Sequence, residues 1–327
     1  MSQFIKEHSP HLFILGSGAI GDNISAIPAI RYAAENIFDL RKFRVMIPPT
    51  LRFLFDFLPE ENIFYIGKED QRVTTEWVVI RHYDLIPSTL HISAILSPMR
   101  MPLVDYASIK FLNMILRKED KDYPKPNLNH VDISKFNLPE KYACILVTNL
   151  NKNRSLPFKT SEKIAKHLIK KGITPVYLGR NTKIVDTFNQ TQTESESPLG
   201  FPGVIDLVDK TSLEEVTKIM GGSHVVIGAD TGLIHLAACT DARIICGYTT
   251  VSPELRIPQR NYVDNWNFIP IAPPASSCRF CASELHRYDV NFNKCKRIDL
   301  QCVSTTLNPE RFIKAIDSLD CEYREYK

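Results

Sequence analysis

The chain has 327 residues, of which 44% are hydrophobic and 24% are charged. This balance is typical of a globular protein and excludes a disordered or fibrous chain. The 40 Lys and Arg residues against 37 Asp and Glu residues give a formal net charge of +3, too small to indicate a nucleic-acid or membrane partner by itself. Because one hydrophobic core rarely keeps growing to this length, we expect two domains.

The start of the chain gives no signal for export or membrane insertion. The first residues, MSQFIKEHSP, lead into the short apolar run HLFIL, without a long hydrophobic region or a small-residue cleavage site. No segment approaches the roughly 18 apolar residues that a membrane-spanning helix requires. We therefore expect a cytoplasmic protein with no membrane span, whose eight cysteines are reduced.

Short apolar runs alternate with amphipathic stretches in the first part of the chain. Strands are predicted at residues 12–15, 45–47, 62–66 and 77–80. Apolar residues recur at helical spacing over residues 24–36, with Pro28 near the predicted start, where proline is tolerated. The alternation predicts a parallel sheet with helices on its faces.

A second α/β region follows a segment that is typical of a linker. Between Lys118 and Pro139 the apolar periodicity is lost, and Pro, Asn and charged residues collect. Beyond it we expect a strand over 142–148, helices over 161–170 and 308–319, a strand over 175–178, and further strand and helix units. The sequence thus predicts an α/β fold of two Rossmann-like domains, residues 1–135 and 136–327, that face each other across a cleft.

The sequence Gly16-Ser17-Gly18-Ala19-Ile20-Gly21 matches the glycine pattern of dinucleotide-binding folds, between a predicted strand and a predicted helix. The second strand lacks the acidic residue that would hold a ribose, which argues against a dehydrogenase. A glycine turn at Gly18 and Gly21 still lets the backbone approach a ligand. Asp22, which follows at once, has two interpretations: a helix N-cap, or a general base that accepts the proton of an acceptor hydroxyl.

The sequence VVIGADTGLIHLA, residues 225–237, predicts a buried strand that leads into a helix. The helix start would direct unpaired N–H groups of Thr231, Gly232 and Leu233 at a ligand, and phosphate is the natural guest. Asp230 suits sugar hydroxyls. The alternative makes Asp230 and Thr231 simple caps, and we interpret His235 as a helix residue packed against the sheet.

Four cysteines, Cys278, Cys281, Cys295 and Cys302, lie within 25 residues in a cysteine-rich loop of about 275–303. In a reducing compartment, such a cluster that opens with C-x2-C indicates a tetrahedral metal site of four thiolates, with no open position for catalysis. The second C-x2-C is missing, so ordinary reduced loop cysteines remain an alternative. Cys144, Cys239 and Cys246 lie in strand or helix patterns and are expected in the core.

Two of these segments resemble the signatures of the heptosyltransferases, glycosyltransferase family 9. The similar residues are Gly21-Asp22 with Pro28 six residues on, and Asp230-Thr231-Gly232-Leu233 followed by His235-Leu236-Ala237. The segment Arg154-Ser155-Leu156-Pro157-Phe158 is similar to a family stretch with a basic residue and then Trp-Pro. Here Arg154 stands where lysine is usual, and Leu156 replaces the tryptophan.

The resemblance implies a GT-B fold and an inverting, metal-independent glycosyl transfer with Asp22 as the base. It implies that Arg154 and residues 230–232 bind the donor, with ADP-heptose as the first candidate. The glycine turn at Gly18 and Gly21 and the N–H of Leu233 are further candidates for donor binding. The four cysteines resemble the iron finger of the autotransporter heptosyltransferases, which implies a structural iron or zinc ion. A homo-oligomer is compatible with this interpretation.

Several questions stay open at this point. The acceptor is a glycan, a lipid sugar, a protein side chain or a nucleic-acid base, and only Asp206 or Asp209 is available as a weak candidate for binding the ribose. Two other functions compete with glycosyl transfer. One is a nucleotide- or metal-binding interaction protein on the same fold, and the other is an NAD-dependent oxidoreductase.

Overall fold

The computed structural model describes ten stretches of the chain, namely residues 10–15, 20–66, 78–81, 101–147, 152–180, 184–185, 192–193, 201–260, 268–281 and 300–325. The chain forms two compact units. The first unit contains Met1–Leu128 and Pro258–Val263, and the second contains Asn129–Ile257 and Asp264–Lys327. Among the described residues no helix is both long enough and apolar enough to cross a lipid bilayer.

The first unit contains a parallel four-stranded sheet with the order β3-β2-β1-β4. Its strands are β1 (His11–Ile14), β2 (Phe43–Ile47), β3 (Ile63–Tyr65) and β4 (Val78–Arg81). All four strands predicted for this region are confirmed. Phe13 of β1 lies at the centre of the core, where its ring stacks on Phe111 with centroids 4.9 Å apart and meets Phe43 edge-on at 5.2 Å.

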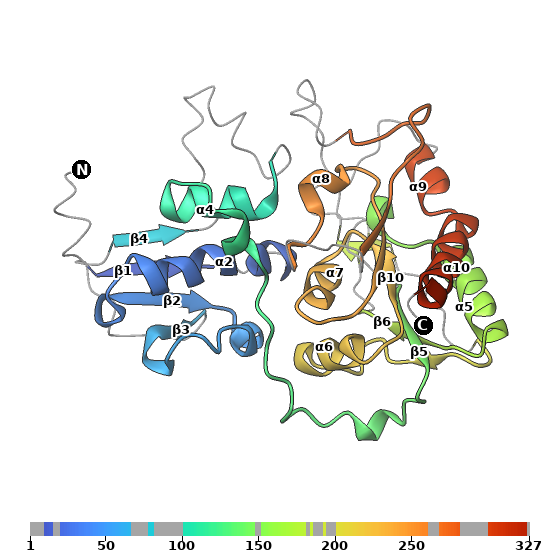
Figure 1. Ribbon diagram of the computed structural model, residues 1–327, viewed down its shortest axis with the longest axis horizontal. Coiled ribbons are helices and arrows are strands. Elements are labelled where there is room, and N and C mark those ends of the chain that lie inside the picture. Colours follow the sequence, from blue (N-terminus) through green and yellow to red (C-terminus); the bar gives the residue numbers. More distant parts are fainter. Residues whose placement is uncertain are drawn as a thin grey trace. The chain divides into compact units, whose positions relative to one another are not determined.

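Two helices pack together in this unit (Figure 1), α2 (Ile20–Asn36) and α4 (Leu103–Leu112). The described short 3-10 turns are η1 (Leu40–Lys42), η2 (Pro49–Leu54), η3 (Glu60–Asn62) and η4 (Lys118–Lys121). The helix predicted from residue 24 begins four residues earlier, at Ile20, so Pro28 lies in the helix interior. Proline has no N–H, but the apolar residues on both sides of it are buried, and this packing keeps the helix continuous.

The segment predicted as a linker contains only 3-10 turns, η4 and η5 (Ser134–Phe136), among its described residues. Lys121 at the end of η4 forms an ion pair with Asp105 of α4, with Nζ and Oδ1 2.6 Å apart. The N–H of Tyr123 donates to the carbonyl of Gln259 at 3.0 Å. This bond joins the first unit to the short return of the chain at Pro258–Val263, which belongs to the same unit.

The second unit is built on a parallel six-stranded sheet with the order β12-β11-β10-β5-β6-β9. Its strands are β5 (Tyr142–Leu146), β6 (Thr174–Leu178), β9 (Ile205–Asp206), β10 (Val226–Ala229), β11 (Ile244–Gly247) and β12 (Phe268–Ile271). A separate antiparallel pair joins β7 (Ile184–Val185) to β8 (Gln192–Thr193). The central strands β5, β10 and β11 are buried along their whole length, as expected for parallel strands covered on both faces.

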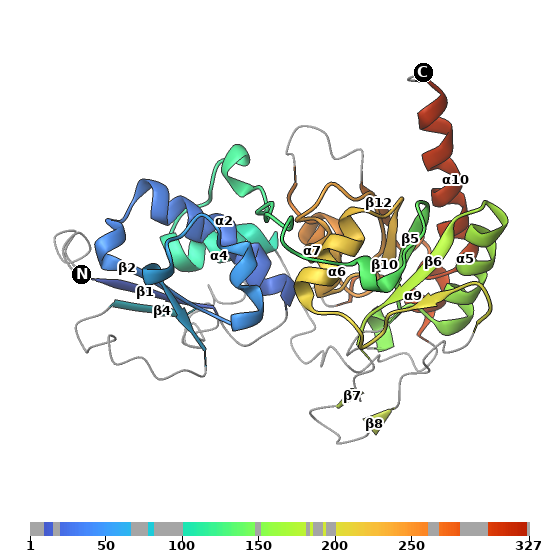
Figure 2. The same cartoon turned by 90° about the horizontal axis from the view of Figure 1, so that it is seen from below.

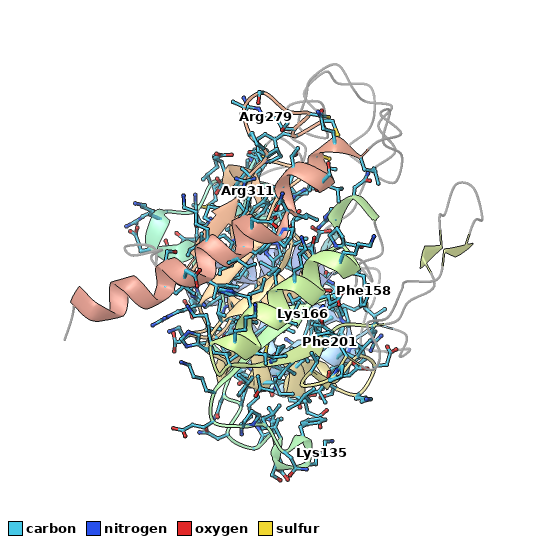
Figure 3. All side chains as sticks on the ribbon, turned by 90° about the vertical axis from the view of Figure 1, so that its right-hand side faces the viewer. Lys135, Phe158, Lys166, Phe201, Arg279 and Arg311 are labelled. Atoms are coloured by element: carbon cyan, nitrogen blue, oxygen red, sulfur yellow. The ribbon has the colours of Figure 1, made fainter. Side chains whose placement is uncertain are left out.

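Helices cover both faces of this sheet (Figure 2). One face carries α5 (Phe158–Lys170) beside α10 (Pro309–Glu325), and the other carries α6 (Leu213–Gly221) and α7 (Gly232–Ala237). Two short helices, α8 (Pro253–Arg256) and α9 (Gln301–Thr306), complete the described set. Figure 3 shows Lys166 on the outer surface of α5, where its ammonium lies 5.2 Å from the ring centre of Phe201.

The core of the second unit lies between the sheet and the pair α5 and α10. Leu156, at the position of the family tryptophan, is buried in this core. Gly247 ends β11 where no side chain fits, because a Cβ atom there would lie 2.3 Å from the Cδ2 atom of Leu307. The close approach of β11 to the segment between α9 and α10 thus depends on a glycine.

Candidate functional site

The candidate site lies at the carboxyl edge of the second sheet. All six strands run parallel, so the segments that follow them meet at one edge, where ligands bind in open α/β sheets. The turn η6 (Lys152–Arg154) follows β5, Asp230 and Thr231 follow β10, and Thr249 follows β11. Because β5, β10 and β11 are neighbours in the sheet, these three segments lie close together.

Arg154 and Asp230 contact each other directly. The Nε–H of Arg154 donates to the main-chain carbonyl of Asp230 at 2.8 Å, and the Nη2 atom lies 3.3 Å from the Asp230 carboxylate. The Asp230 side chain is 4% exposed, whereas that of Arg154 is 28% exposed. The pairing neutralises a buried carboxylate and holds a guanidinium in one orientation, with part of its surface open to solvent.

Thr231 and the start of α7 provide polar groups beside this pair. The N–H of Asp230 is bonded to the carbonyl of Gly247 at 3.0 Å, which fixes the end of β10. Thr231 is the N-cap residue of α7, yet its side chain makes no capping bond, and its buried hydroxyl oxygen has no hydrogen-bond partner. The N–H groups of Gly232 and Leu233 have no acceptor within the helix. Because α7 has only six residues, these individual donors matter more than any helix dipole.

The two carboxylates considered for ribose binding belong to the end of β9 and the turn that follows it. One Asp206 oxygen accepts the N–H of Val208 at 3.0 Å, so this carboxylate stabilises the turn after β9. The N–H of Asp209 donates to the carbonyl of Gly179 at 3.1 Å, at the carboxyl ends of β9 and β6. Asp209 adopts a left-handed backbone with φ of 61°, a conformation that aspartate tolerates in turns.

Asp22 lies in the first unit, in the first turn of α2. The helix begins at Ile20, so the alternative interpretation of Asp22 as the N-cap residue is wrong. Its side chain is half-buried. The pKa of Tyr106 in α4 is raised, first by burial and then by the charge of the Asp22 carboxylate. Gly21 is buried beside Asp22, whereas Gly18 lies outside the described residues.

Three of the four clustered cysteines are described. Cys278 and Cys281 are partly exposed on a turn, and Cys302 is buried in α9. The N–H of Cys278 donates to the side-chain carbonyl of Gln301 at 3.2 Å, so the turn is bonded to the residue that precedes Cys302. Cys295 lies outside the described residues. Within the described ranges, no three His, Cys, Asp or Glu side chains form a group that could hold a metal ion.

The remaining predicted core residues are buried. Cys144, Cys239 and Cys246 are core residues as predicted, and burial raises the pKa of the Cys144 thiol to about 12. Burial and the Asp230 carboxylate raise the pKa of Cys246 well above its usual value. His235 is buried in α7, which confirms its packing role. None of these thiols is a candidate nucleophile, since the reactive form is the thiolate.

Sequence reasoning missed two residues, Thr249 beside the Arg154 turn in the second unit and Tyr106, which interacts with Asp22 in the first unit. The hydroxyl of Thr249 donates to the carbonyl of Asn153, next to Arg154. Neither residue type carries a motif, and both contacts join segments far apart in the chain. The signals available in the sequence were positional: Thr249 lies just after a buried strand, and Tyr106 lies on an amphipathic helix.

Comparison with known proteins places these observations in a family context. Residues 117–274 match the sequence model of glycosyltransferase family 9 (heptosyltransferase). This stretch contains Arg154, Asp230 and Thr231. A search among curated proteins found no match to the chain.

Several solved structures resemble this one. TibC from enterotoxigenic E. coli H10407, an iron-containing dodecameric glycosyltransferase, has a TM-score of 0.71 and 15% identity over 98% of this chain and 78% of TibC. TibC in complex with ADP-D-beta-D-heptose has a TM-score of 0.70 and 15% identity over 97% of this chain and 77% of TibC. E. coli ADP-heptose lps heptosyltransferase II has a TM-score of 0.54 and 11% identity over 96% of this chain and 99% of the transferase. The α/β fold with two parallel sheets is therefore the GT-B fold of these enzymes.

Proposed function

We propose that this chain is a glycosyltransferase that transfers a heptose from ADP-heptose to an acceptor hydroxyl with inversion, and the match of residues 117–274 to the sequence model of glycosyltransferase family 9 supports this proposal. The observation that carries the proposal is the cluster of Arg154, Asp230 and Thr231 at the carboxyl edge of the second sheet. The TibC complex with ADP-heptose and the likeness to heptosyltransferase II support the choice of donor.

Each group in the cluster suits one part of a nucleotide sugar. The partly exposed guanidinium of Arg154 offers N–H donors to the diphosphate oxygens, in a planar arrangement that an ammonium lacks. The buried Thr231 hydroxyl and the N–H groups of Gly232 and Leu233 are further donors for phosphate. Held by Arg154, the Asp230 carboxylate is an acceptor for sugar hydroxyls.

The reaction follows from these assignments. The acceptor oxygen attacks the anomeric carbon of the sugar, and the bond from that carbon to the phosphate oxygen breaks. ADP leaves with the electron pair, and the acceptor proton passes to the carboxylate of Asp22. Attack opposite the leaving group inverts the anomeric configuration. The donors around the diphosphate stabilise the charge that develops on ADP.

We further propose that Cys278, Cys281, Cys295 and Cys302 hold a structural iron or zinc ion. Four thiolates suit either metal, and the bond from Cys278 to Gln301 joins the C-x2-C turn to the segment of Cys302. TibC is described as iron-containing, which supports iron. A closed thiolate site would supply rigidity to this loop rather than a reaction step. Metal analysis of the purified protein and of Cys278→Ser tests the assignment, since the variant should lose the metal.

The dodecameric state of TibC supports a homo-oligomer for this protein too, and light scattering measures it. We also propose that the enzyme acts in the cytoplasm. Reduced, buried cysteines suit that compartment.

The test of the transfer proposal separates donor binding from chemistry. Isothermal titration with ADP should show binding to the wild type and to Asp22→Asn, because Asp22 belongs to the unit that does not carry the donor cluster. Release of ADP from ADP-heptose, with glycan, lipid-sugar and protein acceptors, should occur with the wild type and not with Asp22→Asn. Wild-type turnover by Asp22→Asn would remove the base assignment.

The same titrations discriminate the competing functions. A binding protein on this fold would bind ADP without consuming ADP-heptose in the presence of any acceptor. An NAD-dependent oxidoreductase would bind NAD in preference to ADP. Arg154→Lys and Arg154→Met form a matched pair: the lysine variant keeps the charge and should retain part of the ADP affinity, whereas the methionine variant should lose most of it.

A further inference from the structure

The turn that carries Arg154 is fastened to the loop after β11 by one side chain. The Thr249 hydroxyl donates to the main-chain carbonyl of Asn153 at 2.5 Å. Thr249 is 2% exposed and Asn153 is 6% exposed, so water does not compete freely for this bond. Asn153 directly precedes Arg154 in η6, and the bond therefore restrains the backbone from which the guanidinium extends.

The main chain of Thr249 is held in turn by the cysteine-bearing turn. The N–H of Phe280, which lies between Cys278 and Cys281, donates to the carbonyl of Thr249 at 3.0 Å. Phe280 has a φ of 51°, a conformation that is uncommon for a bulky residue and persists only where its surroundings impose it. Thr249 therefore has its backbone bonded to one segment and its side chain bonded to another.

A second contact joins the same segments without involving Thr249. Helix α9 packs against η6, and its first residue, Gln301, accepts the N–H of Cys278 at 3.2 Å. The loop that leads to the cysteine turn is itself anchored, because Arg311 of α10 donates to the carbonyl of Ala272 at 2.6 Å. In Figure 3, Arg311 marks this anchor on α10 and Arg279 marks the cysteine turn.

We propose that Thr249 is a positioning residue for the donor diphosphate: by bonding η6 to the loop after β11, it fixes the orientation in which Arg154 meets the phosphate oxygens. The inference rests on the proposed function, because it takes the diphosphate as the ligand of Arg154. Thr249 itself touches neither the diphosphate nor the sugar in this proposal. It acts through Asn153 and Arg154, whose Nε–H is aligned on the Asp230 carbonyl.

Two substitutions at Thr249 isolate the hydroxyl. Thr249→Val keeps the branched shape and removes the donor, whereas Thr249→Ser keeps the donor and removes a methyl group. Loss of a single neutral hydrogen bond predicts an increase of about five-fold in the Kd for ADP in Thr249→Val. Thr249→Ser should bind ADP within about two-fold of the wild type. If Thr249→Val does not fold, Thr249→Ala removes the same hydroxyl without new bulk and replaces it in the comparison.

The decisive measurement is a double-mutant cycle on the full-length protein by isothermal titration with ADP and with adenosine, which lacks phosphate. Thr249→Val should increase the Kd for ADP and leave the Kd for adenosine unchanged. It should not increase the Kd for ADP further in the Arg154→Met background. If Thr249 had a general structural role, Thr249→Val would instead increase the Kd for ADP equally in both backgrounds, and it would increase the Kd for adenosine too. Either of those results overturns the inference.

The outcomes also separate this inference from the proposed function. If Arg154→Met weakens ADP and Thr249→Val does not, the donor site stands and the role of Thr249 is refuted. If the wild type binds no ADP, both the donor assignment and the positioning role are refuted. An increase in Kd for Thr249→Val that disappears in the Arg154→Met background establishes the positioning role.

Discussion

Replacing Gly247 by alanine tests the packing that fixes the end of β11. The new Cβ atom would lie 2.3 Å from the Cδ2 atom of Leu307 and 3.2 Å from the Cζ atom of Phe312, both of which are fully buried. Carbon atoms in contact prefer a separation of about 4 Å, so Leu307 must retreat by about 1.5 Å into a core that is already filled. Overpacking of this kind costs about 2 kcal/mol.

Thermal unfolding followed by circular dichroism measures this cost. For a unit of this size, about 2 kcal/mol corresponds to a decrease of about 4–8 °C in Tm. Gly221→Ala is the matched control. It makes the same chemical change in the same unit, but its Cβ atom would meet only the Thr240 side chain, at 3.3 Å, and its helical position favours alanine. The control should change the free energy of unfolding by less than about 1 kcal/mol.

A second substitution shows whether the contact with Leu307 is the cause. Leu307→Ala alone should destabilise the protein by about 3 kcal/mol, because it leaves a cavity. In Gly247→Ala/Leu307→Ala the added methyl group enters that cavity, so the double variant should be more stable than the sum of the single effects by about 1 kcal/mol or more. A Tm for Gly247→Ala equal to that of the wild type, or strict additivity in the double variant, would refute the reasoning.

Two further predictions concern charge and thiol reactivity. Partial burial alone would raise the pKa of Asp317, but hydrogen bonds from Lys171 and His167 lower it. This contact therefore stabilises the folded state at pH values above the ordinary pKa of aspartate. The stabilisation is lost as the pH falls through the lowered pKa. Asp317→Asn should therefore lower the free energy of unfolding at neutral pH by less than about 1 kcal/mol, because the pair is partly exposed. In strong acid the variant and the wild type should have the same Tm, and a lower Tm of the variant that persists in acid contradicts this account. Mass spectrometry after brief alkylation should find Cys144 and Cys246 unmodified in the native protein and modified in denaturant, and rapid native labelling of either would contradict their burial.

Apolar runs in the sequence were sufficient to predict most of the fold. Buried parallel strands must be apolar on both faces, so β1, β5 and β10 stand out as short hydrophobic segments. The start of α2 was harder to predict. Residues 20–23 follow a glycine-rich stretch, and Pro28 suggested that the helix began only shortly before it. Proline in a helix interior is rare, and only tertiary packing makes it tolerable here.

The candidate site was predictable residue by residue but not as an arrangement. Arg154 and Asp230 were each singled out by their sequence surroundings, yet their contact spans 76 positions and depends on β5 lying beside β10. The bond from Thr249 ends on a main-chain carbonyl, which every residue possesses, so no residue pattern marks it. Backbone acceptors of this kind become visible only when the strand order is known.

The return of the chain at Pro258–Val263 has a consequence for synthesis. The first unit is not a continuous segment, since its residues up to Leu128 are joined by a stretch made after most of the second unit. The bond from Tyr123 to Gln259 therefore cannot form until the ribosome has added more than 130 further residues. At a translation rate of about 5–20 residues per second, the last segment of the first unit is synthesised on the order of ten seconds after the rest of that unit. A fragment that ends at the linker would remain in that unfinished state, so truncation is a poor route to an isolated first unit.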